Sequence, residues 1–288
     1  MDTAFDLKTL RATVRDWKTA GLTVALVPTM GNLHAGHISL LKRARELADR
    51  TVVSIFVNPI QFGKGEDYDS YPSTLEADKA KLSAAGLDLL FAPNLDELYP
   101  GGTAEDTRIT VPQLSDILCG EFRPGHFSGV ATVVAKLLIN VQPDTALFGE
   151  KDYQQLLVIR RMVHDLLIPV DIIGMPIVRE PDGLAMSSRN GYLDATQRAT
   201  AAVINQALTT AAARLREPGA RIATIEGDGI AALAAAGMRP EYFSVRRSND
   251  LAPPRPGDTA LVVLAAAWLG PARLIDNVQV ELAEPLAA

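Results

Sequence analysis

The sequence predicts an α/β protein in which a Rossmann-like, doubly wound parallel sheet is followed by a smaller α+β domain. Three observations support this fold class. Short β-branched runs alternate with longer segments of helical periodicity over the first two-thirds of the 288 residues. Only 6% of the residues are aromatic, and alanine and leucine supply much of the 48% hydrophobic fraction, which favours helices packed on a sheet. After about residue 177, the pattern changes to an alanine-rich helix followed by short strand-like runs.

The first domain should contain buried strands joined by helices. Near-continuous apolar runs are typical of strands covered on both faces, and they predict strands at 22–27, 51–57, 88–91, 145–148 and 170–178. Helical periodicity predicts helices at 38–49, 73–85, 129–141 and 154–167. This alternation implies right-handed crossovers and a parallel sheet. Ligands bind beyond the carboxyl ends of such strands, so the loops that follow the strands are the expected place for chemistry.

The second domain should combine helices with three late strands. Its helices are expected at about 195–216 and 230–236, separated by a segment with Pro and several Gly at 217–229, and its strands at 242–246, 260–266 and 274–280. We therefore predict domains at 1–176 and 177–288.

Charge and composition restrict the possible partners and compartment. The formal net charge is -6 and the pI is about 5.3, with basic residues spread along the chain, which argues against a nucleic-acid partner. The single cysteine, Cys119, suits a reducing compartment. We see no leader sequence, and the apolar run 261–269 is about half of the roughly 18 residues that a membrane span needs. A cytoplasmic protein without membrane partners is expected.

Two histidines mark the first candidate site. The segment PTMGNLHAGH, residues 28–37, follows the first strand and opens the first helix, so His34 and His37 lie at a helix N-terminus. Free N–H groups and the helix dipole attract phosphate there, and the imidazoles could donate to phosphate oxygens. Half of a zinc site or two unrelated surface histidines are the alternatives. We favour phosphate binding, because zinc needs about four ligands and the other histidines are only His126 and His164.

Two further loops could complete a phosphate site. GLAMSSRN, residues 183–190, offers hydroxyl groups beside an arginine, although Ser-Ser-Arg alone would more often be an ordinary exposed loop. FGEKDYQQ, residues 148–155, offers Lys151 to a phosphate and Asp152 to a ribose or as a helix cap, although a solvated turn is the alternative. Together with the histidines, the serine–arginine loop resembles the two signature motifs of the nucleotidylyl-transferring α/β superfamily.

Neutral amides indicate how a substrate could be recognised. Gln61 follows the second strand, and Gln155 opens a helix. Each amide offers donors and acceptors, which suits a substrate with hydroxyl and carboxylate groups. The turn RPGHF, residues 123–127, could belong to the substrate side or serve only as a helix entry.

These segments together resemble the pantothenate synthetase (pantoate–β-alanine ligase) family. The matching segments are PTMGNLHAGH, IFVNPIQF (55–62), RPGHF, FGEKDYQQ, VRE with GLAMSSRN (178–190) and RLIDN (273–277), in order along nearly the whole chain. No family motif is found at about 217–260, and Gly270-Pro271-Ala272 stands where the family's Gly-Lys-Thr is expected. The resemblance implies a Rossmann-like first domain, a lid-like second domain and a homodimer.

The resemblance also implies a reaction and its residues. ATP and pantoate would give pantoyl-adenylate and pyrophosphate, and β-alanine would then give pantothenate and AMP. His37 would be the general acid, with His34, Lys151 and Arg189 also acting on the phosphates. Gln61 and Gln155 would bind pantoate, and Gln61 would also lie near β-alanine. The implied ATP-binding residues are Met30, Gly31, Asn32, Leu33, His34, Ala35, Gly36, His37, Gly149, Glu150, Lys151, Asp152, Val178, Met186, Ser187, Ser188 and Arg189.

Some expectations stay open at this point. The family uses Mg²⁺, but no motif identifies its ligands; Asp78 is a candidate, and we prefer to interpret it as an ordinary acid on a helix surface. A nucleotidylyltransferase that stops at a nucleotide-linked product is an alternative enzyme. A nucleotide-sensing or scaffold protein without turnover is an alternative of another class. A tRNA ligase is disfavoured by the acidic charge and by the lack of a recognisable anticodon-binding extension.

Overall fold

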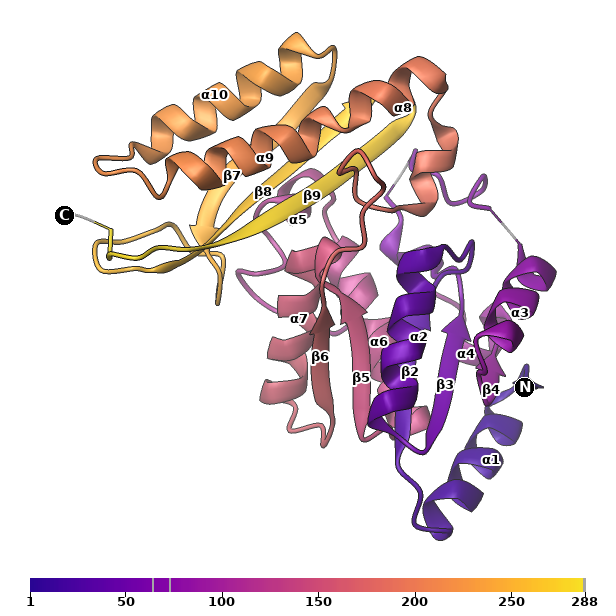
Figure 1. Ribbon diagram of the computed structural model, residues 1–288. Helices are drawn as coiled ribbons and strands as arrows, with labels where there is room; N and C mark the ends of the chain where they lie inside the picture. Colours follow the sequence, from indigo (N-terminus) through magenta and orange to yellow (C-terminus); the bar gives the residue numbers. More distant parts are fainter. Residues whose placement is uncertain (64, 73, 287–288) are drawn as a thin grey trace. The chain divides into compact units, whose positions relative to one another are not determined.

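The computed structural model describes residues 1–63, 65–72 and 74–286, which form two compact units (Figure 1). The first unit comprises Met1–Glu150 and Val158–Pro176, and the second comprises Lys151–Leu157 and Ile177–Ala288. Each unit has its own hydrophobic core. The domain limits expected from the sequence, 1–176 and 177–288, stay a prediction.

Six strands of the described chain form the parallel sheet of the first unit, in the order β1-β4-β3-β2-β5-β6. Their bounds are Asp2–Ala4 (β1), Val24–Thr29 (β2), Arg50–Ile55 (β3), Leu89–Phe91 (β4), Thr145–Gly149 (β5) and Asp171–Met175 (β6). The predicted α/β class is confirmed. The strand order reverses between β2 and β5, and ligands bind beside such a switch point in open α/β sheets. The loops after β2 and β5 are therefore well placed for chemistry.

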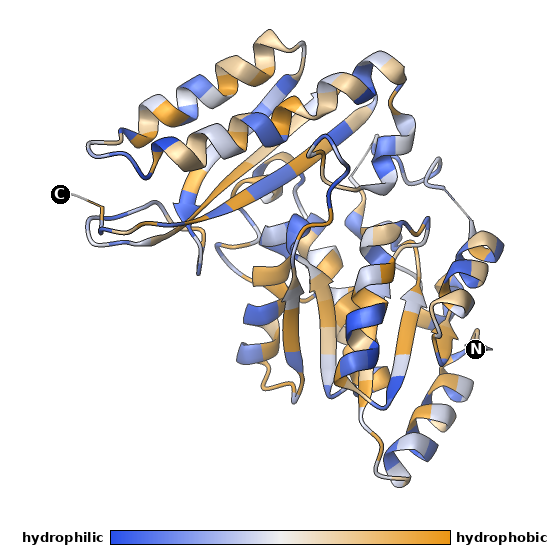
Figure 2. Cartoon of the chain, in the orientation of Figure 1, coloured by the Kyte–Doolittle hydropathy of each residue, from blue (hydrophilic) through white to orange (hydrophobic). Residues whose placement is uncertain are grey.

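Helices cover both faces of this sheet (Figure 1). The α-helices are Leu7–Thr19 (α1), Ala35–Leu47 (α2), Leu75–Ala84 (α3), Leu95–Leu98 (α4), Cys119–Phe122 (α5), His126–Val141 (α6) and Tyr153–Asp165 (α7), with short 3-10 helices at Pro59–Gln61 (η1) and Glu150–Asp152 (η2). Ala25 and Val27 of β2 pack with Leu41 and Ala44 of α2 in one buried cluster. Figure 2 shows hydrophobic residues concentrated on the central strands and hydrophilic residues on α2.

Two elements at the start of the chain were not predicted. Strand β1 has three residues, pairs with β4 and is too short to produce an apolar pattern. Helix α1 buries only Leu10 and Val14 among its 13 residues, so its apolar side is narrow, and Asp6 caps it by accepting from the Thr9 N–H at 2.7 Å.

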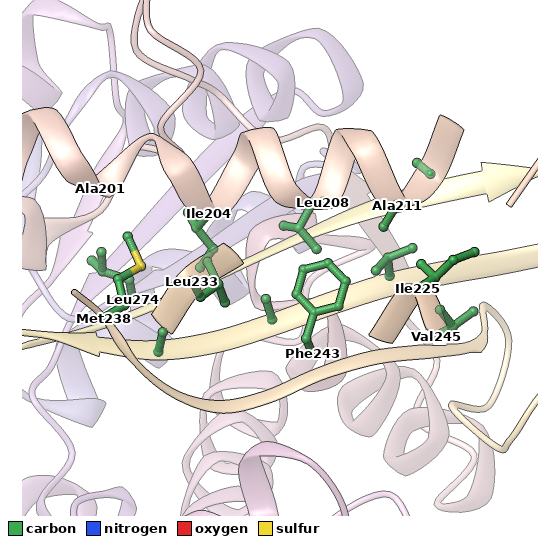
Figure 3. Packing of buried hydrophobic residues seen from close by; sticks show 14 of the residues in the cluster. Ala201, Ile204, Leu208, Ala211, Ile225, Leu233, Met238, Phe243, Val245 and Leu274 are labelled. Carbon is green, nitrogen blue, oxygen red and sulfur yellow. The ribbon is translucent and has the colours of Figure 1, made fainter. Parts of the chain in front are cut away.

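The second unit packs helices on a three-stranded antiparallel sheet in the described part of the chain. The strands are Arg239–Arg247 (β7), Ala260–Leu269 (β8) and Ala272–Glu281 (β9), and the helices are Ala195–Ala201 (α8), Val203–Arg214 (α9) and Ile222–Ala235 (α10), with a 3-10 turn at Ser188–Tyr192 (η3). Figure 3 shows Ile204 and Leu208 of α9 in a shared core with Phe243 of β7. The predicted smaller α+β unit is confirmed.

Helix α10 begins earlier than the sequence suggested. The expected helix covered 230–236, but the observed helix starts at Ile222 and contains Gly227 and Gly229. The prediction was wrong because glycine usually weakens a helix interior. A Cβ atom on Gly229 would lie 2.4 Å from Cδ1 of Phe243, so glycine at this position lets α10 approach β7 closely.

No helix in the described part of the chain has the length and apolar character needed to cross a membrane.

Candidate active site

His34 and His37 cap helix α2 reciprocally. Nδ1 of His34 accepts from the Gly36 N–H at 3.2 Å, and Nδ1 of His37 accepts from the His34 N–H at 3.3 Å. The ring centroids are 4.1 Å apart. Because Nδ1 accepts in both rings, each neutral imidazole carries its proton on Nε2. Two ring N–H donors thus stand at a helix N-terminus, an arrangement suited to phosphate oxygens.

A buried carboxylate holds the loop that leads to these histidines. Asp78 of α3 accepts from the Asn32 N–H at 2.8 Å, the Leu33 N–H at 2.9 Å and the Thr74 hydroxyl at 2.9 Å. Its side chain is 0% exposed, so the interpretation as a helix-surface acid is wrong. Lys81, which is also on α3, donates from its Nζ to the Leu33 carbonyl of the same loop at 2.6 Å. These bonds fix the backbone between β2 and α2.

The loop itself contains two left-handed residues. Gly31 has a φ of 83° and Asn32 a φ of 50°. A Cβ on Gly31 would lie 3.2 Å from Cγ2 of Ile55 and 3.3 Å from a carboxylate oxygen of Asp78, so there is little room for a side chain. Left-handed conformation at a residue other than glycine is costly and tends to persist at functional sites. The bonds from Asp78 provide the compensating hold on Asn32.

Gln61 lies in η1 after β3 and is buried. Its Oε1 accepts from Nδ2 of Asn58 at 3.0 Å, and its Nε2 donates to the sulfur of Met30 at 3.1 Å. The predicted pantoate residue and a residue of the histidine loop therefore touch within the first unit. Asn58 was quoted in the sequence motif but was given no role of its own.

The turn at 123–127 has a structural function. Arg123 donates to both carboxylate oxygens of Glu66, with Nε 2.6 Å from Oε1, and its Nη1 lies 2.9 Å from Nε2 of His126. Arginine can only donate, so Nε2 of His126 accepts and its Nδ1–H donates to the Gln61 carbonyl at 2.7 Å. Burial opposes the charged form of Glu66, but the hydrogen bonds and charge of Arg123 outweigh it and lower the pKa of this carboxyl. The turn could have belonged to the substrate side or served as a helix entry. These bonds support the helix entry, and they also hold Gln61 through its backbone carbonyl.

The segment after β5 is attached to the second unit. Gly149 ends β5 beside Met175, and Glu150 to Asp152 form η2. The Lys151 carbonyl accepts from Nδ2 of Asn277 in β9 at 3.1 Å. Gln155 is half-buried near the start of α7.

The serine–arginine loop, residues 183–190, is held by hydrogen bonds within the segment 178–190. The Met186 N–H donates to the Val178 carbonyl at 2.9 Å, and Ser187 caps η3 by accepting from the Arg189 N–H at 3.3 Å. Ser188 lies within η3 and is half-buried, as is Arg189.

An ion pair secures this loop to β9. Arg179 donates to both oxygens of the fully buried Asp276, at 2.7 and 3.0 Å. Adjacent residues of β9, Asp276 and Asn277, therefore hold the hairpin after Val178 and the segment at Lys151, both within the second unit. Arg179 of the VRE motif and Asp276 of the RLIDN motif were given no role from the sequence, and this ion pair supplies one.

The structure thus groups the predicted residues in two sets. Met30, His34, His37 and Gln61 lie together in the first unit, where Gly149 ends strand β5 and Glu150 follows it. In the second unit, Lys151 and the segment 178–189 are each bonded to β9. Among the described residues, no group of three or more His, Cys, Asp or Glu side chains could hold a metal ion.

The sequence and fold are similar to those of known proteins. The family model described as pantoate-beta-alanine ligase matches residues 3–279. The chain is 53% identical to the pantothenate synthetase of Pseudomonas fluorescens, over 98% of this chain and 100% of the relative, and 58% identical to that of Shewanella amazonensis, over 93% and 95%.

Solved structures agree with this similarity. The pantothenate synthetase of Thermus thermophilus gives a TM-score of 0.89 at 47% identity, covering 96% of this chain and 99% of that one. The pantoate-beta-alanine ligase of Francisella tularensis, solved with a βγ-ATP compound and β-alanine, gives a TM-score of 0.79 at 35% identity, covering 96% and 97%.

Proposed function

The chain belongs to the pantoate-beta-alanine ligase family, and from this premise we propose how it acts. It catalyses the ATP-dependent formation of pantothenate from pantoate and β-alanine. In the first step, the pantoate carboxylate attacks the α-phosphorus of ATP, which forms pantoyl-adenylate and expels pyrophosphate. In the second step, the amine of β-alanine attacks the acyl carbon and loses a proton, and AMP leaves.

The observation that best supports this chemistry is the reciprocal cap of His34 and His37. Negative charge builds on the phosphate oxygens as the carboxylate attacks, and donors already in place stabilise that charge. The caps hold both imidazoles with Nε2–H as the donor, at the positive end of the α2 dipole. We propose His37 as the general acid and His34 as its neighbour at the phosphates.

Other residues are assigned by the family resemblance. We propose that Lys151 and Arg189 contribute positive charge to the phosphates and that Gln61 and Gln155 bind pantoate, with Gln61 also near β-alanine. The remaining proposed ATP contacts are Met30, Gly31, Asn32, Leu33, Ala35, Gly36, Gly149, Glu150, Asp152, Val178, Met186, Ser187 and Ser188. Their support is that Gly149 is the last residue of β5 and that the others lie on segments following a strand or at an adjoining helix start.

Mg²⁺ is proposed as the ion that accompanies ATP. Magnesium usually keeps several waters and binds through substrate phosphates with one or two carboxylates, so a protein cage is not required. It would neutralise phosphate charge. Asp78 does not fit as its ligand, because its carboxylate already accepts from Asn32, Leu33 and Thr74. We also propose a cytoplasmic homodimer whose second unit serves as a lid.

One assay tests the function. The purified chain is incubated with ATP, pantoate and β-alanine, and AMP and pantothenate are measured. Both should form in equal amounts, and omission of β-alanine should abolish pantothenate. Isotope exchange between pyrophosphate and ATP should require pantoate, because the adenylate must form first. The proposal would be contradicted if ATP were consumed without formation of AMP, or if ATP were bound and neither AMP nor pantothenate formed.

A further inference from the structure

A backbone carbonyl determines how the side chain of Asn58 is oriented. Nδ2 of Asn58 donates to the Gly129 carbonyl at 3.1 Å, and a carbonyl can only accept. Gly129 permits this contact, since a Cβ there would lie 2.5 Å from the Ile60 carbonyl oxygen. Helix α6 can therefore approach η1 closely. Asn58 is 1% exposed, so its amide is held in one orientation by neighbouring protein atoms.

The phenol of Tyr99 reinforces the same orientation. Its hydroxyl donates to Oδ1 of Asn58 at 2.8 Å, and the Tyr99 side chain is 1% exposed. Burial, assisted by the nearby carboxylate of Asp106, raises the pKa of Tyr99 far above its ordinary value. The hydroxyl therefore keeps its proton and remains a donor across the working pH range.

The orientation of the Asn58 amide in turn fixes the orientation of the Gln61 amide. Nδ2 of Asn58 also donates to Oε1 of Gln61, at 3.0 Å, so the Gln61 carbonyl faces Asn58 and its NH₂ group faces the other way. There it contacts the sulfur of Met30 at 3.1 Å. A thioether is a weak acceptor, so a substrate oxygen is a better partner for this NH₂ group. Gln61 is thus set as a donor to a carboxylate or hydroxyl oxygen.

We infer that Tyr99 is a positioning residue for the reaction: through Asn58 it holds the Gln61 amide with its NH₂ group toward an oxygen of pantoate. This inference rests on the proposed function. It also implies that Gln61 meets β-alanine through the carboxylate of that substrate and not through its ammonium group, because an NH₂ donor cannot accept from an ammonium group.

The test compares Tyr99→Phe, Gln61→Ala and the double variant with the unmodified protein. KM and kcat are measured for pantoate and for ATP, on chains whose thermal unfolding shows a single transition. Tyr99→Phe removes one hydrogen bond, so the KM for pantoate should rise about 3- to 10-fold. The KM for ATP and kcat should stay within roughly 2-fold. Because Tyr99 acts through Gln61, adding Tyr99→Phe to Gln61→Ala should change the KM for pantoate by less than about 1.5-fold.

A stability control separates positioning from packing. Val14→Ala removes buried apolar atoms from α1 of the same unit and should lower the unfolding temperature without changing the KM for pantoate. The inference is overturned if Tyr99→Phe leaves the KM for pantoate unchanged. It is also overturned if both KM values rise together or if the effect is equally large in the Gln61→Ala background.

Two further outcomes are distinguishable. If Tyr99→Phe does not fold, Asn58→Ser breaks the same chain of bonds and is judged by the same criteria. If the unmodified protein makes no pantothenate, the proposed function fails; an active protein with an unresponsive Tyr99→Phe variant overturns only the role of Tyr99.

Discussion

The backbone N–H of His34 donates to Nδ1 of His37, 3.3 Å away, so the two residues proposed to act on phosphate also hold each other in place. Serine, threonine or aspartate normally caps a helix in this manner. Here the ring nitrogens perform the capping, and the same bonds select the Nε2–H tautomer. Structural and chemical roles are combined in one pair of side chains.

Replacing His37 with alanine should slow pantoate-dependent exchange between pyrophosphate and ATP by roughly 10²- to 10⁴-fold, the usual scale for a lost general acid. The cap bond to His34 is lost as well, which should reduce the free energy of unfolding by about 1 kcal/mol. His164→Ala is the matched control, because its side chain is 84% exposed. Exchange that survives His37→Ala within a few-fold would disprove the general-acid role.

Replacing Asp78 with asparagine should loosen the loop before α2. The Asn32 and Leu33 N–H groups bond to different oxygens of Asp78, and an amide offers only one acceptor oxygen. One of the two N–H groups therefore loses its acceptor, at a cost of roughly 1–3 kcal/mol in unfolding free energy. The KM for ATP should rise. Glu76→Gln on the same helix is the control, since its side chain is 84% exposed. If the two variants behave equally in urea unfolding and in ATP kinetics, Asp78 does not hold this loop as described.

The Glu66–Arg123 pair should make stability depend on acidity. The pKa of Glu66 is lower in the folded chain than its ordinary value near 4.5, so the stabilisation is complete above that value and is lost as the pH falls through the folded pKa. The difference in unfolding free energy between the unmodified protein and Glu66→Gln should be constant above about pH 6 and shrink below about pH 4.5. Urea unfolding across this range checks it; a difference that grows toward low pH would have the wrong sign.

Two glycines of α10 should respond to alanine in opposite directions. A Cβ on Gly229 meets the Phe243 ring, so Gly229→Ala should destabilise the protein by about 1–3 kcal/mol. A Cβ on Gly227 meets no heavy atom within 4 Å, so Gly227→Ala should stabilise it by roughly 0.5–1 kcal/mol. Thermal unfolding of both variants decides, and a stabilised Gly229→Ala chain would show that the close helix–strand contact is not needed.

The sequence predicted the fold class because buried parallel strands carry a strong apolar pattern. The runs at 51–57 and 145–148 correspond to β3 and β5 within a few residues. Strand β1 and the start of α10 were missed for local reasons. Three residues are too few to show a periodic pattern, and Gly227 and Gly229, of which only Gly229 packs against Phe243, made the first part of α10 look like a loop.

The candidate site could be proposed in part from the sequence. Motifs identified the histidines, Gln61 and the serine–arginine loop, since these residue types have recognisable chemistry. Asp78, Tyr99 and Asp276 could not be assigned, because their roles depend on contacts between residues distant in sequence. Nothing near Asp78 in the chain shows that it bonds the backbone at Asn32, 46 positions away.

Strand β9 has a practical consequence for dissecting this protein. Its Asn277 bonds to Lys151, and the Ser248 carbonyl accepts from the Tyr153 hydroxyl, so a piece of chain from the middle of the sequence is built into the second unit. A truncated polypeptide beginning at Ile177 would lack that piece and leave those polar groups without their bonds. Separate expression of the C-terminal part should therefore succeed only when residues 151–157 are grafted back.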